Sequence, residues 1–255
     1  PRRAVAVTFD DGYADNYALA YPILQKYAVP ATVFASSGLI GSRKIFWWDK
    51  IGEMFKKTHR PVLETATIRR AADNLIRLPT VILLSSPTER RAAASNVVKA
   101  LGQLEHGRVA AVVEVLTDQL GVGAEQIDTE RHRLLTWSEL QTMAANGVDI
   151  GAHTVTHQNL ARIRNEGELR KEVNESKRQL EEGMGKRVRG FAYPYGLPQH
   201  YNGAVRAAVV DAGFRYACAA REGRVTPESD RYEISRISMA NAPLPLALWK
   251  VFKCL

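Results

Sequence analysis

Two histidines four residues apart suggest metal chemistry in this chain. His153 and His157 lie in the segment Gly-Ala-His-Thr-Val-Thr-His, directly after an apolar run at residues 148–150 that we expect to form a short buried strand. In a continuing strand the two side chains would be about 13 Å apart, at roughly 3.3 Å per residue. In a helical turn their Cβ atoms would be roughly 5–6 Å apart, and both imidazoles could bind one Zn²⁺ at about 2.1 Å. We therefore interpret both as metal ligands, with ordinary surface or core histidines as the alternative.

Two adjacent carboxylates provide the second part of this chemistry. Asp10 and Asp11 precede Gly12 in a turn that follows the apolar, β-prone residues 4–9. One carboxylate can bind a metal while the other stays free as a base. With two histidines and one carboxylate on the ion, a coordination position remains for water, which is typical of a catalytic site. A metal can lower the pKa of that water to about 7, and the second carboxylate can take its proton. A plain turn at residues 10–12 is the alternative.

The elements around the acidic pair alternate between strand and helix. After the first strand, residues 16–27 carry apolar side chains at helical spacing, and Pro30 precedes a second strand at residues 31–35. This β-α-β order predicts parallel strands joined by a right-handed crossover. The apolar positions of the first helix are Leu19, Ile23, Leu24 and Tyr27.

The same alternation returns in the second half of the chain. Thr136 and Glu139 form a capping box that begins a helix, and Gly147 suits the C′ position of that helix. A long helix at about residues 166–182, which we expect to end at Gly183, follows the histidine segment. Further expected elements are a strand at residues 189–192, a loop at 193–196, a helix at about 201–211, and strands at 216–219 and 234–239.

Repeated strand–helix units predict a parallel α/β barrel. In such barrels the carboxyl ends of the strands share one mouth, where functional sites assemble. The acidic pair, the histidine segment and the loop at residues 193–196 all follow predicted strands. Residues 41–135 are mostly helix-like, with few strand signals. Because the β/α alternation resumes after them, we interpret them as a helical insertion into a single catalytic domain spanning residues 1–255.

Composition narrows the range of partners. The chain of 255 residues is 45% hydrophobic and 24% charged, which is ordinary for a globular protein. Its 35 Lys and Arg exceed its 27 Asp and Glu by 8, and this basic balance favours anionic partners. The basic residues are scattered, however, with no run of five or more, so we do not expect nucleic acid binding. No stretch approaches the roughly 20 apolar residues of a membrane span. Because the chain begins at Pro1 rather than at a methionine, the lack of a signal peptide is uninformative.

Three short motifs together resemble a known enzyme family. Residues 8–12 (Thr-Phe-Asp-Asp-Gly), 153–157 (His-Thr-Val-Thr-His) and 191–196 (Phe-Ala-Tyr-Pro-Tyr-Gly) are similar, in this order, to motifs of the polysaccharide deacetylases with the NodB-homology domain, carbohydrate esterase family 4. The resemblance covers roughly residues 4–40 and 134–240, with the insertion outside it. It implies a distorted, TIM-like (β/α)7 barrel. It also implies hydrolytic removal of acetyl groups from an N-acetylated or O-acetylated glycan by a metal-activated water.

The resemblance assigns roles to individual residues. By position, Asp11, His153 and His157 would bind a divalent metal, with Zn²⁺ as the first choice and Co²⁺ or Ni²⁺ as alternatives. Asp10 would be the general base. The backbone N–H of Tyr195 would help the metal to stabilise the oxyanion, since a fixed donor stabilises the charge that develops on a carbonyl oxygen. The family also implies a location outside the cytoplasm or at the cell envelope.

Two departures from the family pattern concern catalysis. The family's third motif usually begins with an arginine that orients the base, and this chain has Ala192 there. Arg236, in the last expected strand, is the candidate replacement, with a surface or structural arginine as the alternative. The family's fifth motif ends in a histidine that protonates the leaving amine, and residues 236–239 contain none. His200 is a candidate for that role. These gaps resemble the exopolysaccharide-modifying members of the family.

Aromatic residues are candidates for sugar binding. The resemblance places Tyr193, Pro194 and Tyr195 in the substrate cleft, because their loop joins the site. The cluster at residues 46–48 (Phe-Trp-Trp) could stack on sugar rings, with Trp48 as the candidate contact. Packing in the core of the insertion is the alternative.

Two other functions compete with deacetylation of a glycan. One is hydrolysis of a small-molecule amide by a member of the same superfamily, which a closed pocket rather than a long open groove would favour. The other is a carbohydrate-binding homologue without turnover, which the missing third-motif arginine and fifth-motif histidine motivate. The expected partner is an acetylated carbohydrate, and the sequence assigns no oligomeric state.

Overall fold

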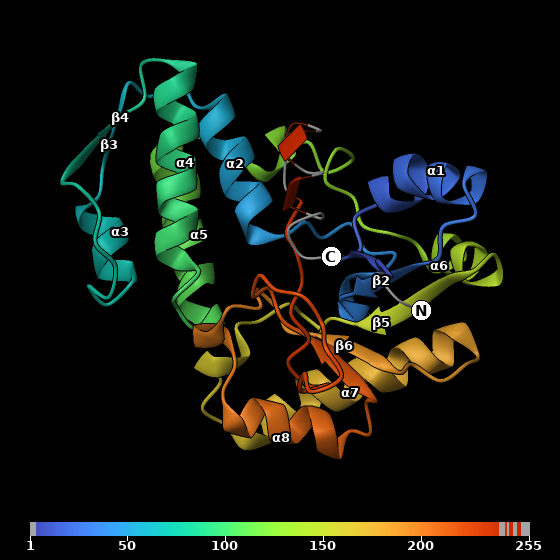
Figure 1. Ribbon diagram of the computed structural model, residues 1–255. Coiled ribbons are helices and arrows are strands. Elements are labelled where there is room, and N and C mark those ends of the chain that lie inside the picture. Colours follow the sequence, from blue (N-terminus) through green and yellow to red (C-terminus); the bar gives the residue numbers. More distant parts are fainter. Residues whose placement is uncertain (1–3, 240–242, 244, 247–248, 251–255) are drawn as a thin grey trace. The chain divides into compact units, whose positions relative to one another are not determined.

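Five parallel strands form the sheet on which the site is built (Figure 1). The computed structural model describes residues 4–239, 243, 245–246 and 249–250. In spatial order the strands are β1 (Val7–Phe9), β2 (Ala31–Ala35), β5 (Val148–Ala152), β6 (Gly190–Ala192) and β7 (Tyr216–Cys218). Each neighbouring pair is parallel, and the sheet curls as part of a barrel. The predicted α/β class with a barrel-type parallel sheet is confirmed.

The central strands carry the apolar residues that a covered parallel sheet requires. Val33 and Phe34 in β2 and Ile150 in β5 are almost completely buried, because helices cover the outer face of a barrel-type sheet and packed side chains fill its inner face. Ala35 pairs with Ala152 at the carboxyl ends of β2 and β5. The two strands therefore end level with each other, and the residues that follow them lie at the same edge of the sheet.

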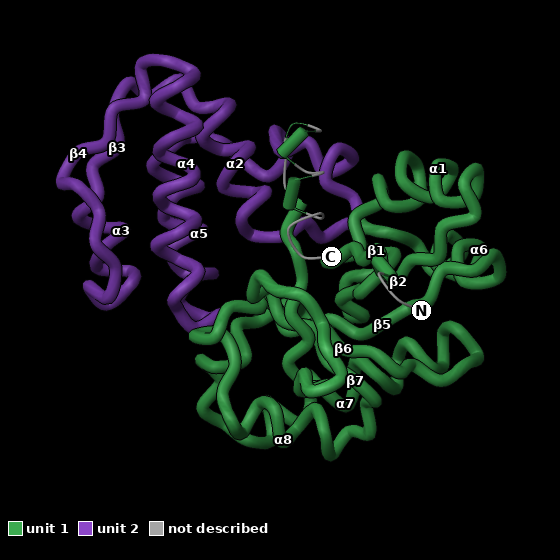
Figure 2. Tube along the Cα trace, viewed as in Figure 1, with its two compact units in different colours: residues 1–42, 134–255 green, residues 43–133 purple. Residues whose placement is uncertain are grey.

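The chain folds as two compact units (Figure 2). Residues 1–42 and 134–255 form the sheet unit, and residues 43–133 form the inserted unit. None of the helices in the described ranges is long and apolar enough to cross a membrane. The helical elements of the sheet unit are η1 (Asn16–Ala20, a π-helical turn), α1 (Tyr21–Lys26), η2 (Ser37–Leu39), α6 (Trp137–Ala145), η4 (Leu160–Arg162), α7 (Glu166–Met184), η5 (Pro198–His200) and α8 (Gly203–Asp211).

The predicted capping box begins α6. Thr136 Oγ1 accepts a hydrogen bond from the amide of Glu139 at 3.2 Å, and the Glu139 carboxylate accepts one from the amide of Thr136 at 2.8 Å. These reciprocal bonds satisfy two of the amides that every helix leaves unpaired at its N-terminus. Gly147 follows the helix with φ of 92°, as its expected C′ position requires.

The long helix α7 continues past the residue at which we expected it to end. It runs to Met184, and Gly185 with φ of 63° follows it. Gly183 lies inside the helix, where an added Cβ would be 2.2 Å from the ring of Trp137. The prediction that Gly183 ends the helix is therefore wrong, because this glycine serves close packing and Gly185 serves termination.

The first helix buries a different face from the one that most of its predicted apolar positions define. Leu24 is buried, but Leu19, Ile23 and Tyr27 are 67%, 59% and 64% exposed. Tyr21, which the prediction did not include, is buried as well, at 6% exposure. Tyr21 and Leu24 also have helical spacing, so spacing alone could not select the buried side of this helix.

The inserted unit has its own apolar core. Its elements are α2 (Trp47–Lys57), β3 (Val62–Glu64), α3 (Ala66–Ala71), β4 (Val81–Leu83), α4 (Pro87–Leu101), α5 (His106–Leu120) and η3 (Ala124–Gln126). The core includes Ile51, Phe55, Val97 and Leu116, each 0% exposed. Helices dominate, as expected, but β3 and β4 form an antiparallel pair that sequence reasoning missed. These strands have three residues each, too few to show a period.

Residues 234–239 form less strand structure than predicted. Ile234 makes a parallel bridge with Cys218, and the amide of Arg236 donates to the carbonyl of Arg221 at 2.9 Å. The segment therefore runs beside the end of β7 without forming a continuous strand. This position brings Arg236 to the carboxyl edge of the sheet.

A glycine substitution in β5 tests this packing. At Gly151 an added Cβ would be 2.3 Å and 2.4 Å from two ring atoms of Phe34, which is fully buried. We expect Gly151→Ala to lower the free energy of unfolding by about 1–3 kcal/mol, the usual cost of overpacking a core, in urea denaturation. Gly203→Ala, where nothing lies within 4 Å, should stay within about 0.5 kcal/mol of the original protein. Equal stability of the two variants would contradict the packing of β2 against β5.

Candidate active site and metal centre

The three predicted metal ligands meet at the carboxyl edge of the sheet. Asp11 Oδ1 lies 3.3 Å from His153 Nε2 and 3.1 Å from His157 Nε2. One ligand atom from each residue lies within 4.8 Å of the others. Both histidines are buried, at 1% and 5% exposure, whereas the Asp11 side chain is 27% exposed. The two imidazoles are therefore shielded from solvent, whereas the carboxylate is partly exposed to it.

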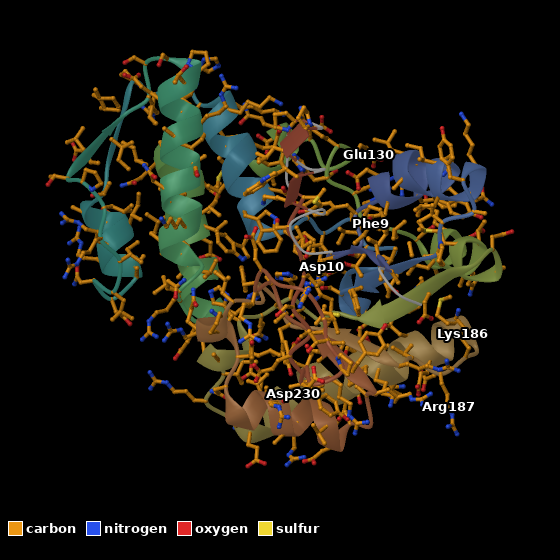
Figure 3. All side chains as sticks on the ribbon, in the orientation of Figure 1. Phe9, Asp10, Glu130, Lys186, Arg187 and Asp230 are labelled. Atoms are coloured by element: carbon orange, nitrogen blue, oxygen red, sulfur yellow. The ribbon has the colours of Figure 1, made fainter. Side chains whose placement is uncertain are left out.

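Left-handed backbone positions create this convergence. Phe9 and Asp10, labelled in Figure 3, mark the point where β1 ends and the acidic pair begins. Asp11 then has φ of 73°, and Thr154 and His157 have φ of 64° and 59°. Such values are uncommon for residues other than glycine. The chain turns sharply between the two histidines, as expected, and their ring centroids lie 4.8 Å apart.

A hydrogen bond fixes the orientation of one imidazole. His153 Nδ1 lies 2.7 Å from the carbonyl oxygen of Ala192 in β6. Because a carbonyl only accepts, Nδ1 carries the proton, and Nε2 is the nitrogen that faces Asp11. Metal-binding histidines commonly donate their other N–H in this way, which sets the tautomer and the ring angle.

Electrostatics couple the three groups. Burial alone would raise the pKa of Asp11, but hydrogen bonds and the charges of His153 and His157 hold that pKa well below its ordinary value. Burial favours a lower pKa for His153, yet the hydrogen bond to Asp11 raises it overall. Burial lowers the pKa of His157. The site thus keeps Asp11 ionised beside two imidazoles.

These residues fit a divalent metal ion. Two imidazole nitrogens and one carboxylate oxygen form a donor set that zinc uses in catalytic sites, with one position left open. Ligand bonds of about 2.0–2.1 Å in a tetrahedron place neighbouring donor atoms about 3.3 Å apart. The observed separations from Asp11 Oδ1, 3.3 Å and 3.1 Å, match that spacing.

The second carboxylate is held by Arg236. Arg236 Nη1 and Nη2 donate to Asp10 Oδ1 and Oδ2, each at 2.7 Å. Nε donates to the carbonyl of Ala219 at 3.0 Å, and Nη1 also lies 3.3 Å from Thr8 Oγ1. The guanidinium is 17% exposed. Burial favours a lower pKa for Arg236, and the bonds to Asp10 raise it overall. Arg236 is therefore not a surface arginine, and it occupies the place beside the acidic pair that the sequence suggested.

The loop after β6 brings Tyr195 to the same edge. Tyr195 has φ of 61°, and its ring centroid lies 5.0 Å from that of His157. Gly196 follows with φ of 61°, and an added Cβ there would be 2.6 Å from the amide nitrogen of Ala220. Only glycine fits both constraints, so the glycine of this motif has a geometric cause.

His200 is bound to this loop rather than free in the site. Its Nδ1 accepts a hydrogen bond from the amide of Leu197 at 3.3 Å. Burial lowers the pKa of His200, which a hydrogen bond to the backbone of Tyr195 partly offsets. The ring lies 5.2 Å from that of Tyr195. His200 does approach the site, as expected, but its contacts are those of a residue that shapes the loop.

Two of the three predicted cleft residues are buried. Tyr193 is 1% exposed, its hydroxyl donates to the carbonyl of Tyr232 at 3.0 Å, and its ring stacks on Tyr201 at 4.3 Å. Pro194 is buried as well. Tyr193 and Pro194 therefore pack under the loop, which corrects the expectation that their side chains line the cleft. Tyr195 is the member of the motif that stays partly exposed.

The aromatic cluster belongs to the inserted unit. Phe46 is 4% exposed, its ring stacks on that of Trp48 at 4.3 Å, and Trp47 lies edge-to-face with Trp48 at 5.4 Å. Trp47 also packs against the core of that unit. This packing favours the core interpretation for Phe46 and Trp47, while Trp48 is partly exposed and stays a proposed sugar contact.

Sequence reasoning missed two residues that support the histidine loop. Ser36, after β2, donates its hydroxyl to the carbonyl of His153 at 2.9 Å. Glu172, in α7, accepts hydrogen bonds from the backbone of residues 155–156. A signal for Glu172 was present, because it falls between Leu169 and Val173 on the buried stripe of α7. An acidic residue at such a position needs a buried partner.

Fold and site define an α/β protein with a candidate metal centre at the carboxyl edge of a barrel-type sheet. The sequence profile of the polysaccharide deacetylase family matches residues 1–70 and 91–217. The chain therefore belongs to the polysaccharide deacetylase family. The match extends into residues 43–133, so the expectation that the insertion lies wholly outside the resemblance is wrong.

Known relatives agree with this assignment. The poly-β-1,6-N-acetyl-D-glucosamine N-deacetylase of Staphylococcus aureus is 23% identical over 243 residues, which are 94% of this chain and 56% of that protein. This chain thus spans about half the length of that relative. The fold resembles the Streptococcus pyogenes deacetylase PplD in complex with acetate (TM-score 0.58, 18% identity, 98% of this chain and 71% of that one). It also resembles IcaB from Ammonifex degensii (TM-score 0.56, 17% identity, 97% and 72%).

The triad predicts a specific pattern of metal binding. We expect apo-protein equilibrated with Zn²⁺ to retain one ion per chain after dialysis, measured by elemental analysis. Asp11→Ala, His153→Ala and His157→Ala should each lose most of it, because two remaining ligands hold zinc poorly. Asp10→Asn is the matched control and should retain the ion. Retention by Asp11→Ala together with loss by Asp10→Asn would reverse the roles of the two carboxylates.

Proposed function

We propose that this protein is a metal-dependent deacetylase that hydrolyses acetyl groups from an N-acetylated glycan. The observation that carries the proposal is the different environment of two adjacent carboxylates. Asp11 faces His153 and His157, whereas both oxygens of Asp10 are held by Arg236. This difference supports a metal-binding role for Asp11 and a proton-transfer role for Asp10 within one site.

The metal would be held by Asp11, His153 and His157, with Zn²⁺ as the first choice. A bound divalent ion supplies Lewis acidity, which acidifies water and polarises a carbonyl oxygen. The remaining steps belong to the chain itself. Asp10 accepts a proton from the attacking water as the water oxygen bonds to the acetyl carbon and negative charge develops on the carbonyl oxygen. The C–N bond then breaks as that oxygen re-forms its double bond to carbon. The leaving nitrogen needs a proton, and protonated Asp10 can supply it.

Two further groups have supporting roles in this proposal. Arg236 holds Asp10 in a fixed orientation, because a bidentate guanidinium fixes the plane of a carboxylate. The amide of Tyr195, on the strained turn beside His157, donates to the carbonyl oxygen as negative charge develops on it. Both groups are fixed by the fold before substrate binds, so they require no rearrangement during the reaction.

For the substrate we propose a glycan containing N-acetylglucosamine. The S. aureus relative is named for poly-β-1,6-N-acetyl-D-glucosamine, and its similarity covers nearly all of this chain. Tyr195 is the proposed sugar contact beside the metal-ligand residues, and Trp48 stays a separate candidate within the inserted unit. We propose that residues 1–255 form one catalytic domain with an inserted helical unit, and that it acts outside the cytoplasm or at the cell envelope, where such polymers occur.

Acetate release tests the proposed reaction. We expect zinc-loaded protein to release acetate from β-1,6-linked N-acetylglucosamine oligomers, to lose this activity with a chelator and to regain it with Zn²⁺. A β-1,4-linked oligomer, assayed in parallel, tests specificity for the glycosidic linkage. An acetylated sugar ester tests whether the acetyl group must be on nitrogen or can be on oxygen. Hydrolysis of the ester alone would point to O-acetyl groups. Metal binding without hydrolysis of any of the three would contradict the proposal and favour a carbohydrate-binding homologue.

The acid–base roles predict how much kcat should fall in two variants. Asp10→Asn should lower kcat about 10²- to 10⁴-fold, the usual contribution of a general base, with zinc content unchanged. Arg236→Lys keeps the charge but not the two parallel hydrogen bonds, and it should lower kcat about tenfold or more with little change in KM. Arg206→Lys, which alters an exposed arginine paired with Asp230 at 2.6 Å, is the control and should keep the original kcat. Full activity of Asp10→Asn would remove Asp10 from the mechanism.

A further inference from the structure

Glu172 connects the long helix α7 to the loop that carries both histidines. Its Oε2 accepts hydrogen bonds from the backbone amides of Val155 and Thr156, each at 3.0 Å. Its Oε1 accepts from Thr156 Oγ1 at 2.8 Å and from Gln158 Nε2 at 3.3 Å. The residue is 6% exposed. A single carboxylate therefore contacts two residues between the two histidines, 155 and 156, and residue 158 just after them.

Backbone amides of η2 hold the opposite side of the same loop through its carbonyl groups. The amides of Ser37 and Gly38 donate to the carbonyls of Thr154 and Val155 at 3.1 Å and 3.0 Å. Gly38 admits this approach because an added Cβ would be 2.7 Å from the Val155 side chain. The loop is thus held from two sides: η2 donates hydrogen bonds to its carbonyls, and Glu172 accepts hydrogen bonds from its amides.

This loop needs external support because its backbone is strained. Thr154 and His157 have φ of 64° and 59°, and a left-handed β-branched residue such as Thr154 is an outlier. Such a residue is unfavourable by itself and persists only where its surroundings enforce it. The amide of His157 bonds to Thr154 Oγ1 at 2.9 Å, which supports the turn from within. Hydrogen bonds to a buried carboxylate are stronger than those between neutral groups, and the three from residues 155–156 support the turn from outside.

The hydrogen-bond partners of Glu172 indicate that its carboxylate serves to hold the histidine loop. Within the described part of the chain, the hydrogen-bond partners found for its carboxylate are amides and a hydroxyl, with no lysine or arginine among them. Its neighbours on the buried stripe of α7 are Leu169, Val173, Ser176 and Leu180. A leucine would suit the packing of that stripe better than a carboxylate, because a buried charge costs free energy unless it is hydrogen-bonded.

We propose that Glu172 is a positioning residue that holds residues 153–158 in the ligand geometry before metal binds. This inference depends on the metal role that the proposed function gives to His153 and His157. Glu172 touches neither metal nor substrate, and it acts through the backbone that aims the two imidazoles. Its loss should therefore weaken metal binding more than it slows the loaded enzyme.

Zinc affinity tests the proposal without any substrate. Apo-protein variants compete with a chromogenic chelator for Zn²⁺, and Kd is read from the chelator's absorbance. Glu172→Leu, which removes both acceptor oxygens, should raise Kd about 10- to 100-fold, the usual effect of losing a residue that supports a ligand. Glu172→Gln keeps one oxygen that can accept from both amides, so its Kd should lie between those of Glu172→Leu and the original protein. Glu175→Leu, one turn along α7 at a partly exposed residue paired with Arg178, is the control and should keep the original Kd.

A purely structural role would give a different result. It would lower the Tm of the apo-protein but leave the Kd of the folded fraction unchanged, and kcat at saturating Zn²⁺ would fall with Tm. We expect kcat at saturating Zn²⁺ to recover to within a few-fold of the original value. If Glu172→Leu fails to fold, Glu172→Asp, which keeps the charge but retracts the oxygens by one methylene, carries the same expectation. Unchanged Kd in a folded Leu or Asp variant would overturn the proposal. Absence of glycan hydrolysis would contradict the proposed function and leave this comparison intact.

Discussion

The site depends on one constraint, the convergence of Asp11, His153 and His157 on a space a few ångströms wide. The ligand atoms lie within 4.8 Å of one another, although they come from opposite parts of the chain. Parallel strands ending level at one edge bring the segments together, and the left-handed residues Asp11, Thr154 and His157 then turn the chain sharply there. Each of these turns is unfavourable in isolation. The sheet, η2 and α7 must therefore supply the contacts that keep the ligands in place.

Each of the two carboxylates in the site is also paired with its own basic side chains. Asp11 is balanced by two imidazoles, and Asp10 by a guanidinium that lies 226 residues further along the chain. Without Arg236, two adjacent carboxylates would repel each other and compete for one cation. With it, the two groups become chemically distinct, which is what metal binding and proton transfer from one dipeptide require. The position of Arg236 follows from the bridge between Ile234 and Cys218.

Much of this could be predicted from the sequence because the relevant signals are local. The spacing of His153 and His157 and the capping box at Thr136 need only neighbouring residues to be interpreted. The predictions that were wrong depend on long-range packing. Spacing could not select the buried face of α1, and the cleft position expected for Tyr193 ignored the hydrogen bond that its hydroxyl makes with Tyr232. The place of Glu172 on the buried stripe of α7 signalled a buried partner, but the sequence could not show which one, since its partners belong to the loop that precedes its helix.

X-ray absorption at the zinc edge of protein loaded with one equivalent of Zn²⁺ tests the central claim most directly. The account predicts two imidazole ligands together with oxygen donors, at about 2.0–2.1 Å, and the loss of one imidazole in His157→Ala. A spectrum with fewer than two imidazoles, or with a sulfur ligand at about 2.3 Å, would show that the ion binds elsewhere. That result would contradict the assignment of Asp11, His153 and His157 as the metal centre.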